Sequence, residues 1–154
     1  MKDELIASIC KELRSRLERL SKAAMDAHAA ATDPGSKAES KYDTRSLEES
    51  YLATGQAKHV KELAGTLRVF ENVRLRDFAA DEEIDGGALV EMKPAMSRES
   101  AFFLLAPASG GLEVMHDGKE ITLLSPESPL YEKLLGKRVG DVLDAPPMKV
   151  SGVS

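Results

Sequence analysis

The fold of this chain is decided by the stretch Ala31-Thr32-Asp33-Pro34-Gly35-Ser36, which separates two long patterns of helical periodicity. Proline fixes one backbone dihedral and glycine tolerates a positive φ, so Asp33-Pro34-Gly35 is strong turn chemistry. Two long helices joined by so short a turn must fold back beside each other. We therefore expect an antiparallel α-helical coiled-coil hairpin over residues 1–76, with its tip near residues 32–37.

Apolar residues recur at spacings of three and four on both sides of this turn, as they do along the seam of a coiled coil. The first set is Ile9, Leu13, Leu17, Leu20, Ala24, Ala27 and Ala31, and the second is Leu47, Tyr51, Thr54, Ala57, Val60, Leu63, Leu67 and Phe70. In a hairpin the small alanines would face the larger Leu47 and Tyr51, which favours pairing within the chain. The second helix is expected to begin near Ser36 or Lys37. A helix that pairs with another protein is the alternative that the first pattern alone leaves open.

Residues 77–154 lack this periodicity and predict a small antiparallel sheet. The acidic, glycine-rich stretch 81–87 is interpreted as a linker or domain boundary. Short apolar runs follow at 88–92, 101–106, 112–116, 120–124, 139–143 and 148–150. Ser109-Gly110-Gly111 and Asp117-Gly118 are predicted to be hairpin turns between them. The fold class is therefore α+β.

One short helix is expected to cross the sheet. Ser128-Pro129 begins it, with serine as the cap and proline in the first turn. Its apolar face is Leu130, Leu134 and Leu135, and Gly136 ends it.

Composition excludes several classes of function. The 154 residues carry a formal net charge of −5, which argues against broad nonspecific binding of nucleic acid. Cys10 is the one cysteine, so no internal disulfide can form and the cytoplasm is the default location. No run approaches the ~18 apolar residues that span a bilayer. His28, His59 and His116 have no metal-ligand spacing, and no catalytic motif stands out, so neither an intrinsic metal nor an enzyme activity is predicted.

Residues 125–141 read SPESPLYEKLLGKRVGD. They resemble the C-terminal domain of the bacterial Gre transcription elongation factors, in which a Ser-Pro-initiated helix runs into Leu-x-Gly-Lys-x-x-Gly-Asp and a closing strand. The matching positions here are Ser128, Pro129, Gly136, Lys137, Gly140 and Asp141. The preceding helical pattern agrees with that family in length, position and direction, so the resemblance covers nearly the whole chain.

The resemblance implies a fold and a partner. The fold is an antiparallel coiled coil followed by a domain similar to FK506-binding proteins. The partner is bacterial RNA polymerase: the C-terminal domain docks on the rim of its secondary channel through the signature region, and the hairpin enters the pore as a monomer. Contact with the RNA 3′ end and with DNA is then indirect, through the polymerase. In cleavage-stimulating members, acidic residues at the tip help to hold the second catalytic Mg²⁺, so the metal is shared and no cofactor is intrinsic.

The tip departs from the family pattern, in which an Asp is followed three residues later by a Glu. Alignment on Tyr42 places Gly35 and Ala38 at these two positions, and a shift by one residue places Ser36 and Glu39 there. The remaining candidate tip carboxylates are Glu39, Asp43 and Asp33. Acids on a solvated helix face are the alternative interpretation, and nearby lysines would oppose capture of Mg²⁺.

The sequence therefore predicts a non-enzymatic regulator of transcription elongation that binds RNA polymerase. It stimulates cleavage of backtracked RNA through the tip carboxylates, or it occupies the channel and modulates the polymerase without cleavage. An unrelated coiled-coil interaction module is the remaining alternative.

Overall fold

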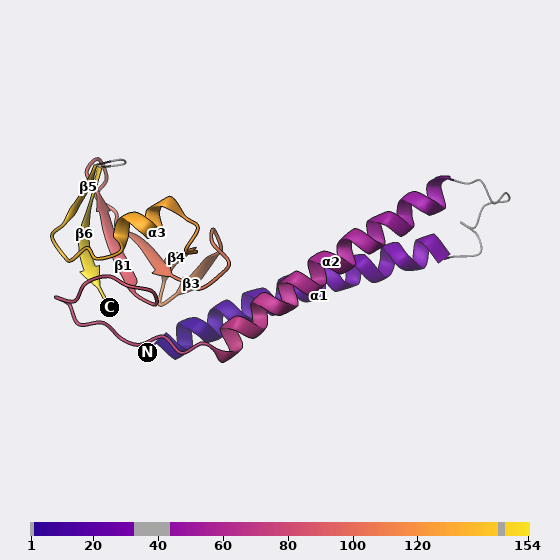
Figure 1. The fold of residues 1–154 in the computed structure, drawn as a ribbon, viewed down its shortest axis with the longest axis horizontal. Coiled ribbons are helices and arrows are strands. Elements are labelled where there is room, and N and C mark those ends of the chain that lie inside the picture. Colours follow the sequence, from indigo (N-terminus) through magenta and orange to yellow (C-terminus); the bar gives the residue numbers. More distant parts are fainter. Residues whose placement is uncertain (1, 33–43, 145–146) are drawn as a thin grey trace. The chain divides into compact units, whose positions relative to one another are not determined.

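The computed structural model describes residues 2–32, 44–144 and 147–154, apart from the side chains of 24–25, 27–32 and 44–57. Two long helices, α1 (Lys2–Thr32) and α2 (Thr44–Asn72), precede a sheet and a short helix, α3 (Pro129–Leu134), so the fold is α+β (Figure 1). The chain divides into two compact units. The helical unit is Cys10–Arg68, and the sheet unit combines Met1–Ile9 with Val69–Ser154. The expected start of the second helix, near Ser36 or Lys37, lies outside the described residues.

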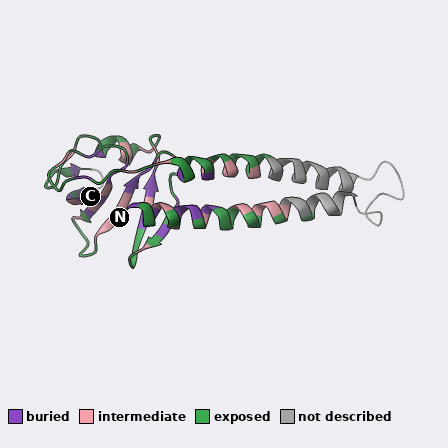
Figure 2. Cartoon of the chain, turned by 90° about the horizontal axis from the view of Figure 1, so that it is seen from below, coloured by how far each residue is buried: buried purple, intermediate pink, exposed green. Residues whose placement is uncertain are grey.

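In the helical unit, α1 and α2 run side by side in both views (Figures 1 and 2). The predicted apolar faces are confirmed where side chains are described. Leu13 and Leu67 are buried, and Leu17, Leu20, Val60 and Leu63 are half-buried. The charged residues between them, such as Arg16 and Lys61, are exposed. No helix in the described part of the chain is both long enough and apolar enough to cross a membrane.

The sheet unit contains six strands in the order β3-β4-β2-β1-β6-β5. Their bounds are β1 Leu89–Pro94, β2 Ala101–Leu105, β3 Glu113–His116, β4 Lys119–Leu124, β5 Val142–Asp144 and β6 Pro147–Val153. Neighbouring strands are antiparallel except β2 and β4, which are parallel. The sheet is therefore mixed, and the prediction of an antiparallel sheet was wrong.

The error lies in the connection between β2 and β3. Ser109-Gly110-Gly111 does not make a hairpin, because β3 pairs with β4 and not with β2. Ser109 and Gly111 have positive φ values of 59° and 88°, and Gly111 N–H donates to Leu123 O at 2.8 Å. This loop attaches to β4 and leads the chain past it to the sheet edge. The Asp117-Gly118 turn between β3 and β4 is confirmed, with φ values of 51° and 74°.

One face of the sheet carries the main hydrophobic core. Its members include Phe78, Ile84, Val90, Met92, Leu105, Leu124, Leu134 and Val150. Leu134 on α3 is fully buried in it, and Leu130 and Tyr131 pack against it. Leu135 is 41 % exposed, so its predicted place on the apolar face was wrong. Helix α3 ends at Leu134, and the backbone of Leu135 (φ −55°, ψ 129°) no longer follows the helical face.

The opposite face contains a row of neighbours across three strands: Glu91 on β1 pairs with Phe102 on β2, which pairs with Ile121 on β4. Side chains alternate between the faces of a strand, so this row points away from Val90 and the main core. These three residues line a cavity of about 540 Å³ together with the buried Leu5 from the first turns of α1. The cavity lies wholly within the sheet unit.

The composition of the stretch 81–87 suggested a linker or domain boundary, but in the structure this stretch is not a free linker. Ile84 is 1 % exposed and belongs to the core. Its N–H donates to Lys137 O at 2.8 Å, and Gly136 N–H donates to Ile84 O at 2.9 Å. One apolar residue among the acids thus binds the stretch to the segment that follows α3.

Candidate functional site

The signature residues 128–141 begin with the predicted helix. Ser128 occupies the N-cap position with an extended backbone (φ −71°, ψ 132°), and Pro129 is the first helical residue. The predicted cap position of Ser128 is therefore confirmed, and its side chain makes no capping hydrogen bond. The backbone carbonyl of Ser128 instead accepts the N–H of Glu132 at 3.3 Å.

Two glycines and one aspartate of the signature build the turns after α3. Gly136 and Gly140 have φ values of 78° and 96°, which side chains disfavour. The Oδ2 atom of Asp141 accepts the N–H of Arg138 at 2.8 Å. Asp141 N–H donates back to Arg138 O at 3.0 Å, and Gly140 N–H bonds Val150 O on β6 at 2.8 Å. Gly136, Gly140 and Asp141 therefore stabilise the turns after α3. Their contact with a partner stays a prediction.

Three apolar side chains in and next to these turns are exposed at the surface. Leu135, Val139 and Val142 are 41 %, 43 % and 61 % exposed. We call them the signature apolar residues. Exposed apolar side chains close together in the sequence and held by a rigid turn are candidates for contact with another protein. Sequence reasoning missed them, although two of them directly precede the turn-forming Gly136 and Gly140.

A groove beside the signature is lined by residues of the acidic stretch 81–85, by Leu135 and Gly136, and by two arginines. Arg76 pairs with Glu82 at 2.7 Å, and Arg138 pairs with Glu83 at 3.0 Å. The hydrogen bond from Arg76, with a second from the N–H of Ala79, lowers the pKa of the Glu82 carboxyl. Glu82 and Glu83 therefore pair with the two arginines that line the same groove.

The candidate tip carboxylates Asp33, Glu39 and Asp43 lie outside the described residues. Their assignment stays a prediction.

A second concentration of charge lies in the sheet unit, at the start of α1. Lys2 is 5 % exposed, and its ammonium donates to Arg76 O at 2.6 Å and to Gly87 O and Ser154 O at 2.7 Å each. It also lies 4.8 Å from the ring centroid of Phe78. Burial lowers the pKa of Lys2 to about 8; Asp77 and Glu82 raise it, and Arg76 lowers it further. Lys2 thus joins the start of α1 to two points of the chain before β1 and to the residue that follows β6.

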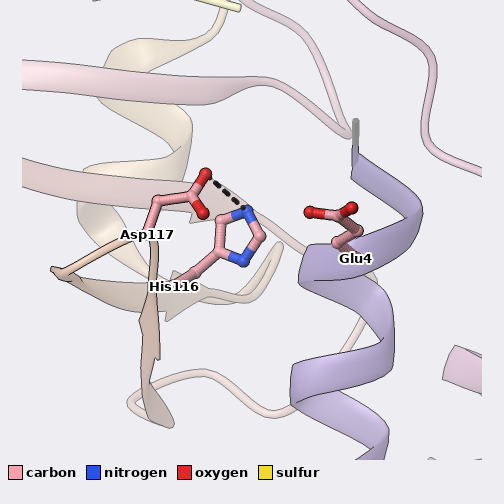
Figure 3. A group of neighbouring side chains, drawn as sticks. All are labelled: Glu4, His116 and Asp117. Carbon is pink, nitrogen blue, oxygen red and sulfur yellow. Dashed lines mark ion pairs between the residues drawn. The ribbon is translucent and has the colours of Figure 1, made fainter.

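One group of described side chains could hold a metal ion. Glu4, His116 and Asp117 each offer a ligand atom, and these atoms lie within 4.8 Å of one another (Figure 3). All three residues also line the 540 Å³ cavity. Sequence reasoning missed the group because Glu4 is far along the chain from the other two, and the adjacency of His116 and Asp117 was the only signal.

Comparison with known proteins gives structural neighbours only. No family model and no curated protein matches the chain. The crystal structure of GreA factor homolog 1 (Gfh1) from Thermus thermophilus is 21 % identical, covers 94 % of each chain and has a TM-score of 0.38. The crystal structure of Thermus aquaticus Gfh1 is 20 % identical, covers 93 % of this chain and 92 % of the other, and has a TM-score of 0.36. At these scores the likeness alone supports no conclusion about the fold or the function.

Proposed function

We propose that this chain is a Gre-like regulator of transcription elongation that binds bacterial RNA polymerase at its secondary channel. The observation that carries the proposal is the signature at 128–141. Its Ser-Pro start, the positive φ of Gly136 and Gly140, and the Asp141 turn meet the backbone needs of one helix–turn–strand element. The order of two long helices followed by this element fits the same family.

The proposal includes the finer architecture of that family. Helices α1 and α2 form an antiparallel coiled-coil hairpin, and the sheet unit is similar to FK506-binding proteins. The protein acts as a monomer in the cytoplasm and performs no chemistry of its own. Contact with the RNA 3′ end and with DNA occurs through the polymerase.

The signature apolar residues supply the docking contact in this proposal. A Leu or Val side chain that is buried on a partner contributes about 1.5–3 kcal/mol when the burial is complete. Leu135, Val139 and Val142 are already partly covered, so each contributes less than that. Arg138, next to Val139 in the sequence, pairs with Glu83 and adds a positive charge.

The binding test uses purified core RNA polymerase and the full chain labelled with a fluorophore. Leu135→Asp and Val142→Asp place a charge in the proposed contact, and each is expected to weaken binding at least about tenfold. Met96→Asp is the matched control, because Met96 is 98 % exposed and lies outside the signature. Equal binding by all three variants and the parent would remove the docking role of the signature apolar residues. Absence of binding by the parent would leave the unrelated interaction module.

The tip decides between stimulation and simple occupancy of the channel. Glu39, Asp43 and Asp33 are the carboxylates proposed to assist the polymerase Mg²⁺. The missing Asp-x-x-Glu pair favours the second candidate, a channel binder that modulates the polymerase without cleavage.

An RNA-cleavage assay on stalled, backtracked complexes separates the two candidates. Cleavage by the parent that falls in Glu39→Ala, Asp43→Ala or Asp33→Ala supports stimulation through the tip. Binding without cleavage supports the second candidate. Cleavage that survives all three alanine substitutions would show that the residue assignment is wrong.

A further inference from the structure

Three side chains meet at the mouth of the cavity in the sheet unit. Glu4 comes from the first turn of α1, His116 ends β3, and Asp117 begins the turn to β4. The imidazole of His116 lies between the two carboxylates, with its Nε2 atom 3.4 Å from Asp117 Oδ2 (Figure 3).

The chemistry of this group suits a divalent first-row transition metal. One imidazole nitrogen and two carboxylate oxygens are ligand types that Zn²⁺ accepts, and open positions are filled by water. Zn²⁺ holds such atoms at about 2.0–2.2 Å, so ligand atoms on a tetrahedral ion lie about 3.5 Å apart. The present separations of up to 4.8 Å therefore need only a small inward movement. Glu4 and Asp117 are exposed and can make it.

Part of the site is already held in place. The side chain of His116 is 15 % exposed, and its backbone pairs with Lys119 in the β3–β4 ladder. The Asp117-Gly118 turn is tight, with both residues in the left-handed region. An imidazole that is already held in place, next to a carboxylate on a tight turn, lowers the ordering cost of binding the ion.

The charges around the site favour a cation. Four carboxylates line the cavity, from Glu4, Asp77, Glu91 and Asp117, together with two lysines. The Lys2 ammonium is engaged by three carbonyls, and the Lys119 ammonium lies over the ring of Phe102 at 4.9 Å. Within the described part of the chain, neither Glu4 nor Asp117 forms an ion pair with a lysine or an arginine.

We propose that Glu4, His116 and Asp117 bind one divalent transition-metal ion. The ion joins the first turn of α1 to the turn between β3 and β4, both within the sheet unit. This site is separate from the signature, so it stands or falls independently of polymerase binding.

The test is a titration of the full chain, freed of metal by a chelator, with Zn²⁺ by calorimetry and by thermal melting. We expect one saturable site per chain and a melting temperature that rises with Zn²⁺. His116→Gln and Asp117→Asn remove a ligand atom at nearly constant shape, and each is expected to weaken binding by about 100-fold or more, because loss of an outer-shell partner alone costs 10–100-fold.

The matched control is His59→Gln. His59 lies 3.9 Å from Glu62 on α2, so it offers a histidine and one carboxylate. The substitution His59→Gln should leave the Zn²⁺ titration unchanged. Co²⁺ in place of Zn²⁺ gives a second readout, a visible absorption band that requires His116.

Several results would overturn the proposal. They are the absence of saturable Zn²⁺ binding by the parent, a Zn²⁺ affinity of His116→Gln equal to that of the parent, and a loss of affinity in His59→Gln equal to that in His116→Gln. Circular dichroism of the metal-free variants shows whether they are folded. If His116→Gln proves unfolded, Glu4→Gln on the exposed helix surface takes its place, with the same expected loss of Zn²⁺ affinity.

Discussion

Replacing Lys2 by methionine keeps the length of a buried side chain and removes its three hydrogen bonds. Ser154 O retains a second donor, the N–H of Leu89 at 3.1 Å. Among the described residues, Gly87 O and Arg76 O accept no other hydrogen bond. The bond to Gly87 O is buried, whereas the bond to Arg76 O is part-buried and water can replace it.

The expected change in the free energy of unfolding follows from the acceptors that lose their donor. A buried group that loses its partner costs about 1–3 kcal/mol, and the part-buried carbonyl adds a smaller amount. Removal of the desolvated ammonium offsets part of this cost. We therefore expect Lys2→Met to lower the free energy of unfolding of the sheet unit by about 1–3 kcal/mol.

The assay is residue-resolved amide hydrogen exchange, because it reports on the amides of the sheet unit separately from those of the helical unit. The N–H groups of Leu89 and Ser154, which pair β1 with the end of β6, should lose protection by the same free energy. Lys149→Met is the control, since Lys149 lies on β6 with an exposed side chain, and it should change stability by less than about 0.5 kcal/mol. Equal protection in Lys2→Met and Lys149→Met would refute the idea that the hydrogen bonds of the Lys2 side chain stabilise the fold.

Three further outcomes are expected. First, the pKa of Lys2 in the folded protein, about 8, is below the ordinary 10.5, so the unfolded chain binds more protons between these pH values and stability rises with pH across that window. Subtracting the profile of Lys2→Met from that of the parent isolates this slope, and a flat difference would contradict it. Second, Gly136→Ala and Gly140→Ala force a side chain into the left-handed region and should each cost about 1–2 kcal/mol in urea unfolding. Gly65→Ala, in open space on α2, should instead stabilise by up to about 1 kcal/mol, and a uniform effect of all three would rule out the backbone explanation. Third, Leu134→Ala should cost about 2–5 kcal/mol, whereas Leu135→Ala, one residue on and half-exposed, should cost much less; similar losses measured in urea would mean that both side chains are buried.

The main core and the signature turn are separate contributions to one unit. Leu134 packs α3 against the sheet in the core, and the Asp141 carboxylate stabilises the turn after α3 by its hydrogen bond with Arg138. A substitution at a signature apolar residue should therefore change binding with little change in stability. This separation makes the polymerase-binding test interpretable.

Local features of the sequence were enough to predict the elements. The spacing of Leu13 and Leu17 gives a helical face, and the Asp117-Gly118 pair gives a hairpin turn, because each signal acts over a few neighbouring residues. The same holds for the start of α3 at Pro129 and for its termination, where Gly136 follows the cap residue Leu135 with a positive φ. The interpretation of the acids at 81–87 as a linker failed because it overlooked one apolar residue, Ile84, which is buried in the core.

By itself, the sequence determined the two amphipathic helices, the strand segments, the Ser-Pro helix and the turn glycines, since each depends on periodicity or on the φ preference of single residues. Only the tertiary structure decided that β2 lies parallel to β4, that Lys2 is enclosed by three carbonyls, and that Glu4 meets His116 and Asp117. These features join segments that are distant in the chain, and their partners are chosen by how strands stack and helices cover a sheet. The spacing of neighbouring residues in the sequence does not reveal which distant segments become partners.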